Sequence, residues 1–242
     1  TAGMRHANQD NVIIDALTYA SGQAFKDTQT VAELGFSFKP DSASRIFMRA
    51  EQNYRFPKID EQAYTSPGNI LDTQTGVSWE VGYEKTLDSG WVSINVYQLE
   101  LEDEIAFDPT ATKPAGAFFN GANVNFDPTT HRGIMLEGDY SVLNNLQFSA
   151  SYTYTDATFD SGSNAGKRVS FVPEHSARLA INWMPAENAS VLLETLYTGE
   201  RYVSGDNANL LPEVDSSTVV NLAMGRQLQN YHIGLRINNL SN

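Results

Sequence analysis

Cysteine is absent from this chain of 242 residues, which excludes disulfide bonds, thiolate metal sites and cysteine nucleophiles. Basic residues are scarce, because 16 Lys and Arg stand against 29 Asp and Glu and give a net charge of −13. No basic cluster occurs, so a nucleic-acid partner is not expected. The chain also lacks sustained helical periodicity and any apolar run near the roughly 18 residues of a membrane-spanning helix. A transmembrane β-strand, however, needs only about 9–11 alternating residues.

Alternation of apolar and polar residues is what the chain has instead, and it is clearest between Thr130 and Phe159. One face of this stretch carries Ile134, Leu136, Tyr140, Val142, Leu146, Phe148, Ala150, Tyr152 and Tyr154. The opposite face is polar. A period of two over such a length predicts two antiparallel strands joined by a tight turn at 143–145.

The same period recurs along the chain. It predicts strands over residues 31–38, 45–56, 77–84, 91–107, 168–184, 190–203, 216–225 and 231–239, with a further strand end at 1–7. A slip of the alternation between Tyr97 and Leu101 predicts a β-bulge. The polar stretch from Asn8 to Thr28 is predicted to be a long loop. The fold class is therefore all-β, with about eleven strands.

Connections of two lengths alternate along the chain. Short turns are predicted at Pro40, Asp88, Leu143, Pro185 and Gln229, and long loops after Asn8, Pro57, Phe107, Phe159 and Val203. This asymmetry is typical of an antiparallel transmembrane β-barrel, with short periplasmic turns and long extracellular loops.

Aromatic residues gather near both ends of the predicted strands, as two interfacial girdles require. Those near the short turns are Phe38, Tyr83, Trp91, Tyr140, Trp183 and Tyr231, and those near the long loops are Tyr54, Phe56, Tyr152, Tyr154, Tyr197 and Tyr202. The alternative is a soluble β-sandwich or propeller whose aromatics fill its core. The many charged residues on the opposite strand faces, such as Arg49 and Glu80, favour a wet lumen.

Seven motifs resemble a known family when they are taken in order. They are YRFPKIDE (54–61), TGVSWEVGYEKTL (75–87), INVYQLELEDEIAF (94–107), NVNFDPTTHRGIMLEGDYSVL (123–143), SASYTYTDATF (149–159), VPEHSARLAINW (172–183) and LRINNLSN (235–242). Together they resemble the barrel half of TonB-dependent outer-membrane receptors. That family's barrel has about 22 strands around a plugged lumen. Residues 1–242 are therefore expected to form a partial barrel domain, a fragment without the plug domain and the closing strand.

The resemblance implies a receptor in the outer membrane of a Gram-negative bacterium, surrounded by lipid, that imports an iron chelate (siderophore) or a similar bulky nutrient. Energy would come from the TonB complex, contacted through the missing N-terminal region. The ligand is expected at the outer mouth, near aromatic and arginine side chains at the loop ends of the strands. The predicted ligand-binding residues are Tyr54, Arg55, Phe118, Phe119, Arg168, Arg201 and Tyr202. A passive porin or translocator barrel and a soluble all-β binding or adhesion module remain alternatives.

No catalytic or metal-binding pattern accompanies these features. The four histidines are far apart, no serine lies in a G-x-S-x-G motif, and no glycine-rich phosphate loop follows a strand. The loop residues Asp206, Asn207 and Asn209 lack the acidic density of a calcium site. The sequence therefore predicts neither an enzyme nor a metal site, and no cofactor.

Overall fold

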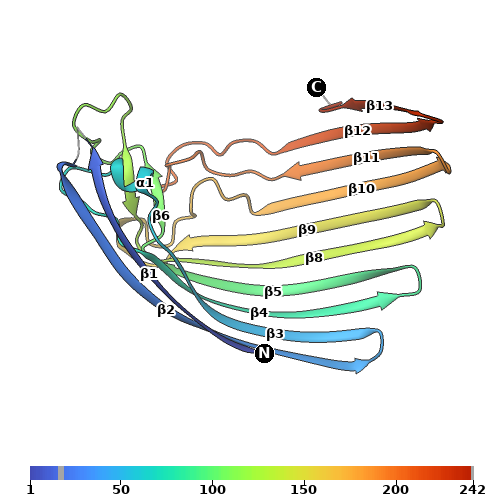
Figure 1. Ribbon diagram of the computed structural model, residues 1–242, viewed down its shortest axis with the longest axis horizontal. Helices are drawn as coiled ribbons and strands as arrows, with labels where there is room; N and C mark the ends of the chain where they lie inside the picture. The colour runs from blue at the N-terminus through green and yellow to red at the C-terminus, as the bar shows by residue number, and fades with distance from the viewer. Residues whose placement is uncertain (16–18, 241–242) are drawn as a thin grey trace.

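The computed structural model describes residues 1–15 and 19–240, and its main feature is one large, curved antiparallel sheet (Figure 1). The sheet has 11 strands in the order β1-β2-β3-β4-β5-β8-β9-β10-β11-β12-β13. Their bounds are β1 (Ala2–Asp15), β2 (Tyr19–Asp41), β3 (Ser44–Arg55), β4 (Gln74–Leu87), β5 (Gly90–Glu102), β8 (Thr129–Leu143), β9 (Leu146–Phe159), β10 (His175–Ala186), β11 (Ala189–Thr198), β12 (Ser217–Leu228) and β13 (Tyr231–Ile237). Apart from β6 and β7, which form a separate sheet, strands that are consecutive in the chain are also neighbours in the sheet. This meander order is that of a barrel wall, so the predicted all-β fold class is confirmed.

The two ends of the sheet differ as predicted. Two-residue turns at 42–43, 88–89, 144–145, 187–188 and 229–230 lie at one end, on the right in Figure 1, which we call the turn end. Long connections at 56–73, 103–128, 160–174 and 199–216 lie at the other, the loop end. The loop end also holds helix α1 (Ile59–Ala63), a 3-10 turn η1 (Gly162–Asn164), and a two-stranded sheet of β6 (Ile105–Asp108) and β7 (Ala122–Asn125).

The predicted loop from Asn8 to Thr28 is wrong. Here β1 and β2 pair continuously from Ala2 opposite Leu34 to Ile13 opposite Gln23. Polar side chains support the pairing, since Lys26 forms an ion pair with Asp10 at 2.7 Å and the Thr28 hydroxyl donates to Asn8 at 2.8 Å. The polarity indicates that these strand segments extend into water beyond the apolar band. Of the predicted loop, residues 16–18 lie outside the described part of the chain.

The predicted bulge between Tyr97 and Leu101 is also wrong, because β5 pairs in unbroken register with both β4 and β8. The alternation continues, but its outer face becomes polar at Gln98 and Glu100, where β5 leaves the apolar band. The strand predicted from residue 168 begins only at His175. Proline at 173 cannot donate to a ladder, and Phe171 has φ of 67°, which no strand residue adopts.

The apolar faces of the strands are exposed rather than packed. Phe36, Val92 and Leu179 keep 60%, 45% and 57% of their surface accessible. The largest fully buried side chains instead belong to the loop end, namely Leu71, Gln62, Thr65, Thr129 and Pro57. A soluble β-sandwich or propeller would bury the strand faces, so the described residues do not fit that alternative. An exposed apolar band on a single sheet fits contact with lipid instead.

Ion pairs and hydrogen bonds line the opposite, lumen face. Arg49 pairs with Glu33 at 3.0 Å and with Glu51, and Arg178 pairs with Glu194 at 2.7 Å. The Asn95 amide donates to Glu80 at 3.0 Å. These partnered charges are those expected of a wet barrel interior.

Neither described helix is long or apolar enough to cross a membrane.

Candidate ligand-binding site

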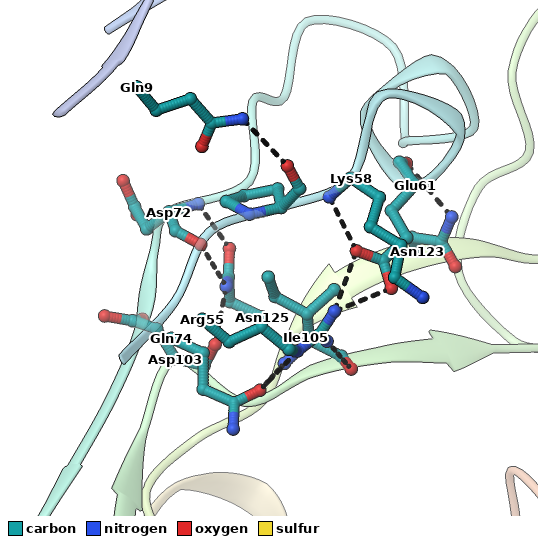
Figure 2. Close-up of polar contacts among 11 residues, drawn as sticks. Gln9, Arg55, Lys58, Glu61, Asp72, Gln74, Asp103, Ile105, Asn123 and Asn125 are labelled. Carbon is teal, nitrogen blue, oxygen red and sulfur yellow. Dashed lines mark hydrogen bonds and ion pairs between the residues drawn. The ribbon is translucent and has the colours of Figure 1, made fainter. Parts of the chain in front are cut away.

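Arg55 lies at the loop end of β3, at the centre of a polar network (Figure 2). Its guanidinium donates to both carboxylate oxygens of Glu61 in α1, at 2.8 and 2.9 Å, and to the Ile105 carbonyl at 2.9 Å. Its Nε donates to Gln74 at 3.3 Å. Three segments, α1, β4 and β6, are therefore joined by one side chain whose three nitrogens are all engaged.

Two asparagines extend this network into the β6–β7 sheet. Asn125 accepts from the Asp72 backbone N–H at 2.8 Å and donates to the carbonyls of Asp72 and Asp103, at 3.1 and 2.8 Å. Asn123 donates to the Glu61 carbonyl at 3.0 Å (Figure 2). These bonds fix the small sheet against the loop that follows β3. With the contacts of Arg55 they join several of the connections at the loop end, which together we call the loop layer.

Tyr54 precedes Arg55 and packs against other aromatic and basic groups. Its ring lies 4.9 Å from that of Phe56, and the Arg5 guanidinium lies 5.4 Å over it. Its hydroxyl is buried without a hydrogen-bond partner. The Tyr54 ring therefore contacts Arg5 of β1 and Phe56, which directly follows β3.

Arg168 and Tyr202 meet where the β9–β10 and β11–β12 connections pack together. The Arg168 guanidinium lies 5.6 Å over the Tyr202 ring, and Nη1 donates to Glu213 at 2.7 Å. A second carboxylate, Glu174, lies 3.6 Å from Nε. The Asn209 side-chain amide forms two hydrogen bonds with the backbone of Arg168: its oxygen accepts from the Arg168 N–H at 2.8 Å, and its nitrogen donates to the Arg168 carbonyl at 3.0 Å. The charge of Arg168 is therefore neutralised by two acids within its own loops.

Arg201 differs from Arg168 in its electrostatics. Its guanidinium lies 5.3 Å over the ring of Phe171 and donates to the Gly199 carbonyl at 3.3 Å. Among the described residues, no carboxylate lies within ion-pairing distance of it. A cation stacked on an aromatic ring, with its charge unneutralised, is suited to receive an anionic group.

Phe171 was not predicted as a site residue, because its segment read as the start of a strand. It is 59% exposed, and its φ of 67° is a left-handed conformation that bulky side chains rarely adopt. A backbone bond from its N–H to the Tyr202 carbonyl, at 3.0 Å, holds it there. Strained, exposed aromatic residues are characteristic of binding sites. No signal in the sequence distinguished Phe171 from the other aromatic residues of the predicted strands.

Phe118 and Phe119 lie in the β6–β7 connection and are 97% and 75% exposed. The Tyr64 hydroxyl donates to the Phe119 carbonyl at 2.8 Å, which ties this connection to the segment after α1. Pro109, in the same connection, packs against Gly205 of the β11–β12 connection. The two phenylalanines thus belong to the same loop layer as Arg201, although the described contacts do not join them directly.

Two carboxylates at the start of this β6–β7 region have shifted pKa values. Burial raises the pKa of Asp103, and the nearby charges of Asp72 and Glu102 add to that rise. Burial also acts to raise the pKa of Glu104, but hydrogen bonds from His131 and Thr129 outweigh it and hold the pKa below its ordinary value. The Thr129 hydroxyl donates to Glu104 at 2.9 Å. In the described part of the chain, no group of three or more His, Asp or Glu side chains is arranged so that it could hold a metal ion.

The seven predicted site residues therefore fall into three groups, one of which is Phe118 and Phe119 in the β6–β7 connection. Arg168, Arg201 and Tyr202 come together with Phe171 in one cluster, which we call the Arg201–Phe171 cluster. Tyr54 and Arg55 lie elsewhere in the loop layer, in contacts that join its segments. Their roles in ligand binding stay predictions.

Comparison with known proteins identifies the family. The family model "TonB dependent receptor-like, beta-barrel" matches residues 1–240. The ferrioxamine B receptor of Salmonella typhimurium (strain SL1344) is 28% identical over 187 residues, which cover 72% of this chain and 25% of that receptor. The chain therefore spans about a quarter of the length of the curated relative that it matches.

Solved structures share the fold at low identity. The ferric yersiniabactin uptake receptor of Yersinia pestis matches with a TM-score of 0.70 and 16% identity, over 91% of this chain and 33% of that one. A ferric citrate transporter matches with a TM-score of 0.74 and 14% identity, over 99% and 37%. A copper transporter matches with 0.76 and 14%, over 99% and 38%. All are receptors or transporters by name. The chain belongs to the TonB-dependent receptor family, whose β-barrels lie in the outer membrane of Gram-negative bacteria.

Proposed function

We propose that this chain forms part of the wall and outer mouth of a receptor that imports a ferric siderophore, or a similar bulky chelate, with energy delivered through TonB. It carries no catalytic step of its own. Two similar proteins support this ligand class, because one is named as a receptor for ferrioxamine B and the other for ferric yersiniabactin.

The observation that carries the proposal is the Arg201–Phe171 cluster. An unneutralised guanidinium stacked on an exposed ring offers charge, hydrogen-bond donors and a flat apolar surface together. Ferric chelates commonly expose anionic oxygens beside an organic scaffold, which matches those three features. Phe118 and Phe119 would add apolar contact from the neighbouring connection.

Equilibrium binding of a panel of ferric siderophores, followed by quenching of intrinsic fluorescence, tests this proposal. We expect Arg201→Ala to weaken binding of the recognised chelate by about tenfold, which corresponds to roughly 1.4 kcal/mol. The matched control is Arg132→Ala, because Arg132 is also a loop-end arginine but is paired with Asp156 at 2.8 Å on the outer face. Equal affinity in the two variants would contradict the role of Arg201.

A passive porin is the remaining alternative, and uptake distinguishes it. Iron uptake from the recognised chelate should stop in cells that lack TonB. Uptake that continues at the same rate without TonB would favour the porin.

A further inference from the structure

An apolar groove crosses the lipid-facing surface of β5, β8, β9 and β10. Its volume is about 730 Å³. The groove follows one row of register partners, in which Val92 pairs with Gly138, Gly138 with Ala150, and Ala150 with Leu179. Gly138 and Ala150 make the floor low because one has no side chain and the other has a single methyl group.

Large side chains on both adjacent rows form the walls of this groove. Toward the turn end, Tyr140 pairs with Phe148. Toward the loop end, Leu136 pairs with Tyr152. All four residues line the groove. The surface faces the hydrocarbon of the membrane, where unfilled space would lose dispersion contacts, so an alkyl chain is the natural occupant.

A pair of opposite charges lies at one end of the same row. Val92 pairs with Lys85, and Lys85 pairs with Ser44. The Lys85 ammonium donates to the Ser44 hydroxyl at 2.8 Å and lies 3.5 Å from the Asp41 carboxylate. Asp41 also accepts from Ser44 at 3.0 Å. The side chains of Lys85 and Asp41 remain 35% and 53% exposed, at the turn end of the sheet.

We propose that this row is a binding site for a zwitterionic glycerophospholipid of the periplasmic leaflet. One acyl chain lies in the groove over Gly138 and Ala150. The phosphate accepts from Lys85, and the headgroup ammonium donates to Asp41. Charge complementarity selects this occupant, because an anionic headgroup would bring its negative charge to Asp41 without a compensating cation.

Native mass spectrometry of the protein purified from outer membranes tests the proposal. The probes are phosphatidylethanolamine and phosphatidylglycerol, added separately to the delipidated protein in detergent. We expect Ala150→Leu, which fills the groove, and Lys85→Gln, which removes the cation, each to reduce retained phosphatidylethanolamine at least tenfold. The matched controls are Ala50→Leu, on the lipid-facing side of β3 outside the groove, and Lys39→Gln, near the same turn end. Both controls should retain the lipid as the unmodified protein does.

Two results would overturn the proposal. One is equal lipid retention in Ala150→Leu and Ala50→Leu, or in Lys85→Gln and Lys39→Gln. The other is equal retention of both probes, since phosphatidylglycerol lacks the ammonium that Asp41 would bind. Heat-modifiable migration on gels reports whether each variant has folded. If Ala150→Leu does not assemble, Lys85→Gln decides, because it leaves the groove and the strand pairing unchanged.

Discussion

Arginine side chains in the loop layer differ in how much of their hydrogen-bonding capacity the protein already uses. Arg55 donates from all three of its nitrogens to Glu61, Gln74 and the Ile105 carbonyl. The described partners of the Arg201 side chain are a ring and one carbonyl. We therefore assign a scaffolding role to the first and ligand contact to the second. The sequence alone could not distinguish these two arginines, because the contacts in which they differ are with residues from distant segments of the chain.

Replacing Arg55 tests the scaffolding role. Lysine has one terminal nitrogen where arginine has three, so it cannot hold Glu61, Gln74 and the Ile105 carbonyl together. We therefore expect Arg55→Lys to loosen the contacts of α1 with β6 by about 1–3 kcal/mol. Hydrogen exchange of the amides in residues 58–73 should become faster. The control is Arg132→Lys, which changes an exposed pair outside this network and should leave that exchange as it is. Unchanged exchange in Arg55→Lys would show that the network does not hold α1.

Glu104 predicts a pH dependence of the same layer. Its pKa is lowered in the folded protein, so its carboxylate stabilises the fold above the ordinary glutamate pKa of about 4.3, and that contribution is lost as the pH falls through the lowered value. We expect Glu104→Gln to reduce the protection factors of amides in 103–108 at pH 7. The difference from the unmodified protein should shrink as the pH falls below the ordinary glutamate pKa and vanish below the lowered pKa of Glu104 in the folded protein. A difference that does not change with pH would contradict the claim that the ionised Glu104 carboxylate stabilises this region.

At the scale of strands, the sequence predicted most of the sheet because alternation is a local signal. The hairpin of β8 and β9 and all five short turns were confirmed to within a few residues. The long β1–β2 hairpin was missed because its water-exposed part is rich in polar residues on both faces, and pairs such as Lys26 with Asp10 stabilise it without a periodic apolar face. The β6–β7 sheet and α1 were missed as well, because both depend on contacts with Arg55 and Asn125 rather than on a periodic pattern.

Two substitutions in β2 test which face of the strands contacts lipid and which lines the lumen. Phe36 lies on the apolar, exposed face, and Ser37 lies on the opposite face. A lysine on a lipid face costs about 2–4 kcal/mol at the membrane midplane, whereas a lumen position tolerates charge. We expect Phe36→Lys to lower the folded fraction in the outer membrane strongly and Ser37→Lys to leave it nearly unchanged, as measured by heat-modifiable migration. The reverse order would mean that the two faces are assigned the wrong way round.

For the whole molecule, the order of the motifs and the alternation of short and long connections predicted the family and the fold. They did not predict which residues come together in the candidate site. Three of the seven predicted ligand-binding residues gather in one cluster, and its central aromatic residue, Phe171, was not predicted. Loop contacts join residues across two separate connections, and no local period encodes such contacts. The proposed ligand site requires that this loop layer face the cell exterior.

Single-cysteine labelling tests that placement most directly, because the chain has no cysteine of its own. One variant carries Phe118→Cys at the loop end, and the other carries Asn188→Cys in the turn between β10 and β11. A membrane-impermeant maleimide applied to intact cells should label Phe118→Cys readily. It should label Asn188→Cys only after the outer membrane is permeabilised. Labelling of Asn188→Cys in intact cells, with Phe118→Cys protected, would contradict the account.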